Sequence, residues 1–287
     1  MNHLLLNLLL KYYSLALCCS LFILLMASCS MEKKLAQTFI DTRPEIDLQL
    51  FTPDILFKFN HKGEEIEGFN ALSDSQQDSA LYVNSKFIQF VDDSIYLEQY
   101  MNSFIDELRA IGFNVFLDHS VDSFLQRKPQ SYVINISQVQ LDEYKFPLVD
   151  SEPFEDTVYT RSFKLNAVDA SAWFELSKLN TPNPKKTVLY SSFTASDGFD
   201  GNFLINTFTR DIQYKYKIDS LKLRDINDLA DYTGWKDASY IFDFFMNQYI
   251  AFHLPKGMEP LYFLHYDRFH KTFSPAEDDM FEVLDAK

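Results

Sequence analysis

The sequence predicts an α+β fold, in which a mainly antiparallel sheet carries a few packed helices within a single main domain. Long segments of alternating apolar and polar residues at 131–144 and 158–179 are typical of strands. A helical pattern precedes both segments at Tyr96–Ile111, where apolar residues recur at the three- and four-residue spacing of one helix face. The order strand, helix, strand, short helix, strand from residue 81 onward predicts a sheet with helices packed on it.

The first 28 residues are typical of a secretory signal peptide. Lys11 is the one charged side chain of this stretch, an apolar run to Met26 follows it, and the run ends in Ala27 and Ser28. A basic residue, an apolar core and a small-residue cleavage site are the parts of such a peptide. We therefore expect four regions: a signal peptide (1–28), a membrane tether (29–45), a globular α+β domain (46–273) and an acidic tail (274–287).

Residues 26–29, Met-Ala-Ser-Cys, resemble the lipobox of bacterial lipoproteins. The resemblance implies that the leader is removed and that acyl chains such as palmitate are attached to Cys29, the site that then anchors the protein to a membrane. The alternative is an uncleaved leader that stays as a membrane helix, since residues 12–28 reach the lower limit for spanning a bilayer. Cysteine usage favours lipidation: Cys18 and Cys19 lie in the leader, so Cys29 is the only thiol of the mature chain.

Cysteine content and charge exclude several classes of protein. One cysteine permits neither an intramolecular disulfide nor a cysteine-ligated zinc site in the mature chain. The net charge is −15, and loss of Lys11 takes it to −16, which is a poor match for the phosphates of nucleic acids. Residues 30–34 lack the acidic cluster that some Gram-negative lipoproteins use for export to the surface, so we expect attachment to the outer membrane, facing the periplasm.

The first half of the expected domain contains most of its predicted core elements. Pro53 interrupts the first strand, and Gly112 follows the long helix as a C-terminal stop. In order, the predicted elements are a strand at 48–60, a polar loop at 70–79, a strand at 81–91, the helix at 96–111, a strand at 113–117, a short helix at 121–125 and a strand at 131–144.

The second half reads mainly as hairpins followed by two helices. Glycine-containing turns between alternating segments predict hairpins, and Thr233-Gly234 predicts a helix break. The predicted elements are an acidic loop at 146–157, a strand at 158–179 with a bulge near Asp169, strands at 186–196 and 202–218 paired across 197–201, helices at 223–232 and 235–252, and a final strand at 261–273.

The helix predicted at 235–252 is apolar nearly all round. Its polar stripe is narrow, consisting of Ser239, Asp243 and Asn247. A helix of this kind must be buried on most sides, so a central core helix is one interpretation. The other is a face that binds a partner protein or an acyl chain, for which the candidate residues are Phe242, Phe245 and Tyr249.

Clusters that could carry chemistry are few, and each has an ordinary explanation. Nucleotide-binding, serine-hydrolase and zinc-protease motifs do not occur. Strand geometry places His265 and His270 on opposite faces, which suits a metal poorly. We therefore expect no catalytic, cofactor or metal site. The clusters considered are His265, Asp267 and His270; Asp197, Asp200 and Asn202; and Asp118, His119 and Ser120.

The order of elements from about residue 81 to 252 resembles the auxiliary lipoproteins of envelope ABC transport systems and, more broadly, small periplasmic lipoproteins that assist outer-membrane assembly. This resemblance implies a non-enzymatic binding or scaffold role with a protein partner in the envelope. Two alternatives stay open: a surface-exposed lipoprotein that binds glycans or nutrients, and a hydrolase built around His119 or His253. The segments that carry the resemblance are 112–115, 131–136, 172–176, 187–190 and 239–250.

Overall fold

The computed structural model describes residues 31–126, 131–179, 187–275 and 282–284. These residues divide into two compact units where the sequence predicted a single main domain. The larger unit comprises residues 45–239 and 282–284, and the smaller unit comprises residues 31–44 and 240–275. Helix α5 (Leu223–His253) belongs to the larger unit up to Ser239 and to the smaller unit from Tyr240.

The larger unit is built on a seven-stranded sheet with the order β11-β6-β5-β4-β1-β3, in which β2 also pairs with β4. Strands β4, β5, β6 and β11 are antiparallel, whereas β1 runs parallel to β3 and β4, and β2 parallel to β4. The α+β class is confirmed, and the sheet is mixed. Its strands are β1 (Asp47–Phe51), β2 (Leu56–Asn60), β3 (Asn114–Phe116), β4 (Ser131–Phe154), β5 (Thr157–Lys178), β6 (Thr187–Ser196) and β11 (Glu282–Leu284).

Strands β1 and β2 share one edge of β4. β1 pairs with β4 residues 131–135, and β2 pairs with residues 139–143. The predicted interruption at Pro53 is confirmed, since it lies between the two strands. The predicted bulge near Asp169 is wrong: the register shift lies in β4, between Ile136 and Gln138.

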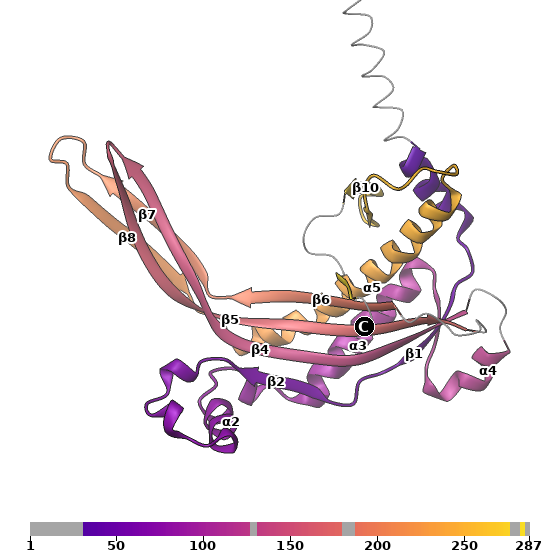
Figure 1. Cartoon of the computed structure of the whole chain (residues 1–287), viewed down its shortest axis with the longest axis horizontal. Helices are drawn as coiled ribbons and strands as arrows, with labels where there is room; N and C mark the ends of the chain where they lie inside the picture. The colour runs from indigo at the N-terminus through magenta and orange to yellow at the C-terminus, as the bar shows by residue number, and fades with distance from the viewer. Residues whose placement is uncertain (1–30, 127–130, 180–186, 276–281, 285–287) are drawn as a thin grey trace, which may run out of the picture. The chain divides into compact units, whose positions relative to one another are not determined.

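Helix α3 (Asp93–Ile111) confirms the clearest helical pattern of the sequence. The Asp92 side chain accepts a hydrogen bond from the amide of Ile95, and Gly112 follows with φ 109°, a left-handed conformation that suits glycine. Its buried face packs on the sheet, where Phe104 stacks on Phe174 of β5 with ring centroids 5.8 Å apart. Figure 1 shows α3 and the first part of α5 along the same face of the sheet.

The short elements of the larger unit depart from the predictions in one segment. Helix α4 (Val121–Leu125) confirms its prediction, with η4 (Asp118–Ser120) before it. The predicted loop at 70–79 and strand at 81–91 are wrong. Ser73 and Gln76 cap helix α2 (Asp74–Val83) there, followed by η3 (Ile88–Phe90), and η1 (Gly63–Glu65) and η2 (Phe69–Ala71) precede it.

The acidic loop predicted at 146–157 is also wrong, because β4 and β5 continue to a tight turn at Glu155, where φ is 51°. Pro147 and Pro153 are tolerated within β4. Among the described residues, no strand pairs with the other edge of β4 beyond Glu143, and prolines within sheets occur mainly on such edge strands.

A second hairpin consists of β7 (Gly198–Ile205) and β8 (Ile212–Asp219). The sequence predicted strands at 186–196 and 202–218 as partners, which is wrong, since β6 pairs instead with β5 and β11. The chain leaves the main sheet at Asp197. The carboxylate of Asp197 accepts hydrogen bonds from the backbone and side-chain amides of Asn166 and from the amide of Leu221, each at 2.7 Å.

Helix α5 runs through the break predicted at Thr233-Gly234. Position 234 has no room for a side chain, since a Cβ atom there would lie 2.3 Å from the carbonyl oxygen of Tyr100 on α3. The absence of a side chain allows the two backbones to approach closely, and glycine keeps the backbone N–H that a helix requires.

The smaller unit contains a helix at residues 31–42, the second part of α5 and the hairpin of β9 (Leu264–Asp267) and β10 (Thr272–Pro275). The hairpin replaces the single strand predicted at 261–273. The segment expected as a tether is thus helical over residues 31–42, with Ala36 and Phe39 buried. Part of the expected tail forms β11, which pairs with β6 in the larger unit.

Candidate functional site

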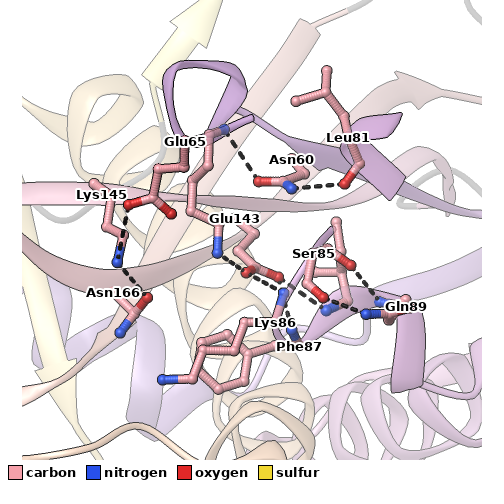
Figure 2. A network of polar contacts seen from close by, with 12 residues as sticks. Asn60, Glu65, Leu81, Ser85, Lys86, Phe87, Gln89, Glu143, Lys145 and Asn166 are labelled. Carbon is pink, nitrogen blue, oxygen red and sulfur yellow. Dashed lines mark hydrogen bonds and ion pairs between the residues drawn. The ribbon is translucent and has the colours of Figure 1, made fainter. Parts of the chain in front are cut away.

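A buried carboxylate organises the most polar part of the larger unit. Glu143 of β4 is 0% exposed, and its carboxylate receives the ammonium group of Lys62 together with the backbone amides of Lys86, Phe87 and Ile88 (Figure 2). The three hydrogen bonds from these backbone amides measure 2.7, 2.9 and 3.1 Å. A buried charge is tolerated when it is paired and hydrogen-bonded, and this one meets both conditions.

Side-chain amides and hydroxyls reinforce this anchor. Asn60 donates to the carbonyl of Leu81 at 2.7 Å and accepts from the amide of Lys62 at 3.1 Å, while Ser85 accepts from the amide of Gln89 at 3.1 Å (Figure 2). The segment from residue 61 to residue 90 is therefore held on the sheet by the Glu143 carboxylate and by the bond from Asn60 of β2 to Leu81, while the contact of Ser85 with Gln89 is internal to the segment.

A hollow of about 730 Å³ lies beside this anchor. Gly63 leaves room for the ring of Phe69, which a Cβ atom would approach to 2.7 Å. His61 stands at the wall, and its Nε2 lies 2.6 Å from the carboxylate of Asp142. The lining mixes amide, carboxylate, imidazole and apolar groups: Asn60, His61, Gly63, Glu64, Ile66, Gly68, Phe69, Asn70, Ala71 and Leu81.

A ladder of polar side chains extends from His61 along β4. Asp142 accepts a hydrogen bond from Gln140 at 2.6 Å, and Gln140 accepts one from Gln138 at 2.5 Å. These residues alternate with buried ones, so they lie on the sheet face opposite the core. On the same face Trp173, the cross-strand partner of Gln138, contacts Tyr190 with ring centroids 4.8 Å apart. The face thus combines an aromatic pair with hydrogen-bonding groups.

The distal part of the β4–β5 hairpin and the β7–β8 hairpin form a second structure, here called the arm: residues 144–164 and 198–219. No residue of the arm is buried, whereas the remainders of β4 and β5 carry much of the core. Figure 1 shows the β7–β8 hairpin alongside the distal ends of β4 and β5.

Aromatic rings hold the two layers of the arm together. Phe163 of β5 contacts Phe199 and Tyr216 with centroids 4.8 and 4.9 Å apart. The hydroxyl of Tyr214 donates to Asp150 at 2.6 Å, and desolvation together with that carboxylate raises the pKa of Tyr214 to about 12. Such a thin core leaves apolar side chains at the surface, among them Val149 at 61%, Val158 at 64% and Phe208 at 97% exposure.

The three residues proposed as a partner face do not form an open surface. Phe242 and Phe245 are 9% and 4% exposed, and Tyr249 is half-buried. Within the smaller unit the ring of Phe39 lies 5.5 Å from that of Phe242 and 5.4 Å from that of Tyr249. These rings therefore pack on residues of their own chain, as the core-helix interpretation expected.

Two of the three residues of the polar stripe, Asp243 and Asn247, are buried too, and they bind β9. Asp243 is 0% exposed, and its carboxylate accepts from the amide of Tyr266 at 2.9 Å and contacts Nδ1 of His265 at 2.5 Å. One turn later, Asn247 exchanges two hydrogen bonds with the backbone of Leu264, at 2.7 and 2.8 Å. Asp243 and Asn247 thus form a clamp for a strand.

The histidine cluster near the C-terminus separates into two unrelated pairs. His265 faces Asp243, while Asp267 closes the β9–β10 turn by accepting from the amides of Phe269 and His270. Hydrogen bonds from the backbone and then the side chain of His270 lower the pKa of Asp267 to about 2. No group of three or more metal-binding side chains occurs in the described ranges.

The other two candidate clusters are also not assembled into sites. The carboxylate of Asp197 accepts the hydrogen bonds described above. Burial raises the pKa of Asp197, but these hydrogen bonds lower it by more, so the net shift is downward. Asp200 and Asn202 are exposed on β7. Ser120 begins α4 but hydrogen-bonds to the backbone of Leu117 and not to the helix amides. His119 lies in η4, and His253 contacts the carbonyl of Tyr249 at the end of α5.

The leader and Cys29 lie outside the described residues. Among the residues that are described, no helix is long and apolar enough to cross a membrane. No protein-family model matches the sequence, and no curated protein sequence matches it.

Sequence reasoning missed Glu143 and the polar ladder. A signal existed for Glu143, since it occupies a core-facing position in the alternation that includes Val139 and Leu141. A carboxylate at a core-facing position of a strand indicates that it has a buried partner. No local signal could identify Lys62 as that partner, because it is 81 residues away.

Proposed function

We propose that the protein is a lipid-anchored component of the cell envelope that acts by binding, as a non-enzymatic scaffold in envelope transport or outer-membrane assembly. The observation that carries the proposal is the arm, which combines a thin aromatic core with exposed apolar residues. Scattered exposed apolar residues are common on proteins, but Phe208 at 97% exposure stands at the connection of a hairpin that is itself nowhere buried.

The anchoring half of the proposal rests on the lipobox-like Met26–Cys29 sequence, with attachment to the outer membrane facing the periplasm. Replacement of Cys29 by Ser should abolish labelling by a fatty-acid probe and release the protein from the membrane fraction. Labelling that persists in this variant would show that Cys29 is not the acylation site. Membrane association without labelling would favour an uncleaved leader.

The binding half is tested by site-specific photo-crosslinking in cells. A photoreactive phenylalanine at position 208 should give a discrete adduct with an envelope protein. The same probe at Glu98, an exposed position on α3, is the matched control and should not give that adduct. Adducts that are absent from both positions, or identical at both, would refute a binding role for the arm.

A second candidate function, the binding of glycans or similar nutrients, is favoured by the polar face of the sheet. Trp173 and Tyr190 supply a pair of tilted rings in contact, on the same face as the amide groups of Gln138 and Gln140. Retention on immobilised polysaccharides should be lost in Trp173→Ala and kept in Tyr82→Ala, which removes an exposed ring on α2. Equal retention of the two variants would dismiss this function.

A further inference from the structure

A cluster of buried oxygen atoms lies where α3, α5 and β6 meet in the larger unit. Asp237 of α5 is 0% exposed, and the hydroxyl of Tyr100 on α3 donates a hydrogen bond to its Oδ2 at 2.8 Å. The other carboxylate oxygen, Oδ1, has no hydrogen-bond partner among the described residues. Buried carboxylates are rarely left in this state.

Two neighbouring hydroxyls share this condition. The hydroxyls of Ser191 on β6 and Tyr96 on α3 are buried, and within the described part of the chain neither makes a hydrogen bond of good geometry. Ser191 is nevertheless close enough to Asp237 to affect its pKa, and Tyr96 lies near Thr233 and Asp237. Three under-satisfied oxygen atoms thus meet at one junction of three elements.

The surroundings of Asp237 favour its neutral form. The groups that face it are hydroxyls: those of Tyr96 and Tyr100 from α3, Ser191 from β6 and Thr233 from its own helix. Burial raises the pKa of Asp237 to about 7, and the Ser191 and Tyr100 hydroxyls lower it only in part. A protonated carboxyl also gains an O–H donor, which the neighbouring under-satisfied oxygen atoms can accept.

We propose that Asp237 is a proton-operated latch: its neutral form holds α3, α5 and β6 together, and its ionisation loosens this junction. The latch goes beyond the proposed binding function, because it concerns how the larger unit responds to pH. It does not depend on the arm or on Cys29, so either proposal can fail without the other.

The sign of the pH dependence follows from linkage. The pKa of Asp237 is higher in the folded state than in the unfolded state. At a pH between these two pKa values, folding therefore takes up a proton. The stabilisation is complete below the unfolded pKa and is lost as the pH rises through the folded pKa. With an ordinary pKa of 3.8 and a folded-state pKa of about 7, Asp237 changes the unfolding equilibrium constant about a hundredfold between pH 5 and pH 8.

The test compares the full-length protein with Asp237→Asn, a neutral isostere, and with Asp228→Asn, which removes an exposed acid from the same helix. Urea unfolding is measured from pH 5 to pH 8. The ratio of the unfolding constants of wild type and Asp237→Asn should change about a hundredfold over this range, whereas the ratio for Asp228→Asn should stay constant. A constant ratio for Asp237→Asn, or an Asp237→Asn protein less stable than wild type at pH 8, would overturn the proposal.

A second variant keeps the proposal testable if Asp237→Asn does not fold. Tyr100→Phe removes the hydrogen bond that favours the ionised carboxylate, so the midpoint of the pH dependence should move to higher pH. Hydrogen exchange of the α3 amides in wild type should accelerate across the same pH range beyond the intrinsic effect of pH. An unchanged midpoint together with constant protection of α3 would rule out the latch.

Discussion

The Glu143 anchor offers the sharpest test of how the larger unit is held together. Replacing Glu143 with Ala leaves the ammonium group of Lys62, which is 5% exposed, without its counter-ion. It also removes the acceptor for three backbone amides. Breaking a buried ion pair from one side costs about 3–5 kcal/mol, so the variant should lose that much stability.

The exposed pair of Lys164 and Glu64 is the matched control. Its side chains are 65% and 78% exposed, so Glu64→Ala should cost no more than about 1 kcal/mol. Urea unfolding curves with unchanged slopes give both values. Hydrogen exchange should show that the amides of residues 86–88 lose protection in Glu143→Ala only.

The double replacement Lys62→Met with Glu143→Ala, compared with each single replacement, separates the charge from the amide acceptor. It removes both charges, so the part of the loss due to the unpaired ammonium group should be recovered, while the unsatisfied amides remain. A coupling energy of about 2 kcal/mol or more is expected from the double-mutant cycle. If Glu143→Ala costs no more than Glu64→Ala, the view of this carboxylate as an anchor is refuted.

Three further variants test individual contacts. Gly234→Ala should destabilise the protein by about 1–2 kcal/mol in urea unfolding, because its Cβ would meet a backbone oxygen of α3 and overpacking outweighs the gain in helix propensity. Asp150→Asn should lower the pKa of Tyr214 from about 12 towards 10, as followed by ultraviolet absorbance. His270→Ala should raise the pKa of Asp267 from about 2 only part of the way to 3.8 in a carboxyl NMR titration, because the backbone donor of residue 270 remains.

Local patterns predicted the elements whose determinants are local. Helix α3 has its apolar face, its Asp92 cap and its terminal Gly112 within one continuous stretch, and its position was predicted closely. The beginning of β4 and nearly all of β5 followed from alternation. The prolines in β4 led to the prediction of a loop. That prediction was wrong because the sequence does not reveal that this part of β4 has an unpaired edge.

Elements defined by distant contacts could not be predicted in this way. Residues 86–88 have strand-like composition, but their amides bind a carboxylate more than 50 residues away and not a neighbouring strand. Gly234 is of a residue type that disfavours helices, yet it lies where the backbones of α3 and α5 approach closely. In both cases a distant partner, which the local sequence does not reveal, decides the local structure.

Helix α5 shows why the polar residues of an apolar helix need to be interpreted one by one. Asp237 and Asp243 are both fully buried, but their partners differ in kind. Asp243 receives a backbone amide and an imidazole, groups that satisfy a carboxylate and fix a strand. Asp237 meets only hydroxyls among the contacts described for it, and one of its oxygen atoms has no donor in the described residues. Asp243 is therefore a structural clamp for β9. Asp237 is matched best when it carries a proton, which is the physical basis for expecting Asp237→Asn to alter the pH dependence of stability near neutrality.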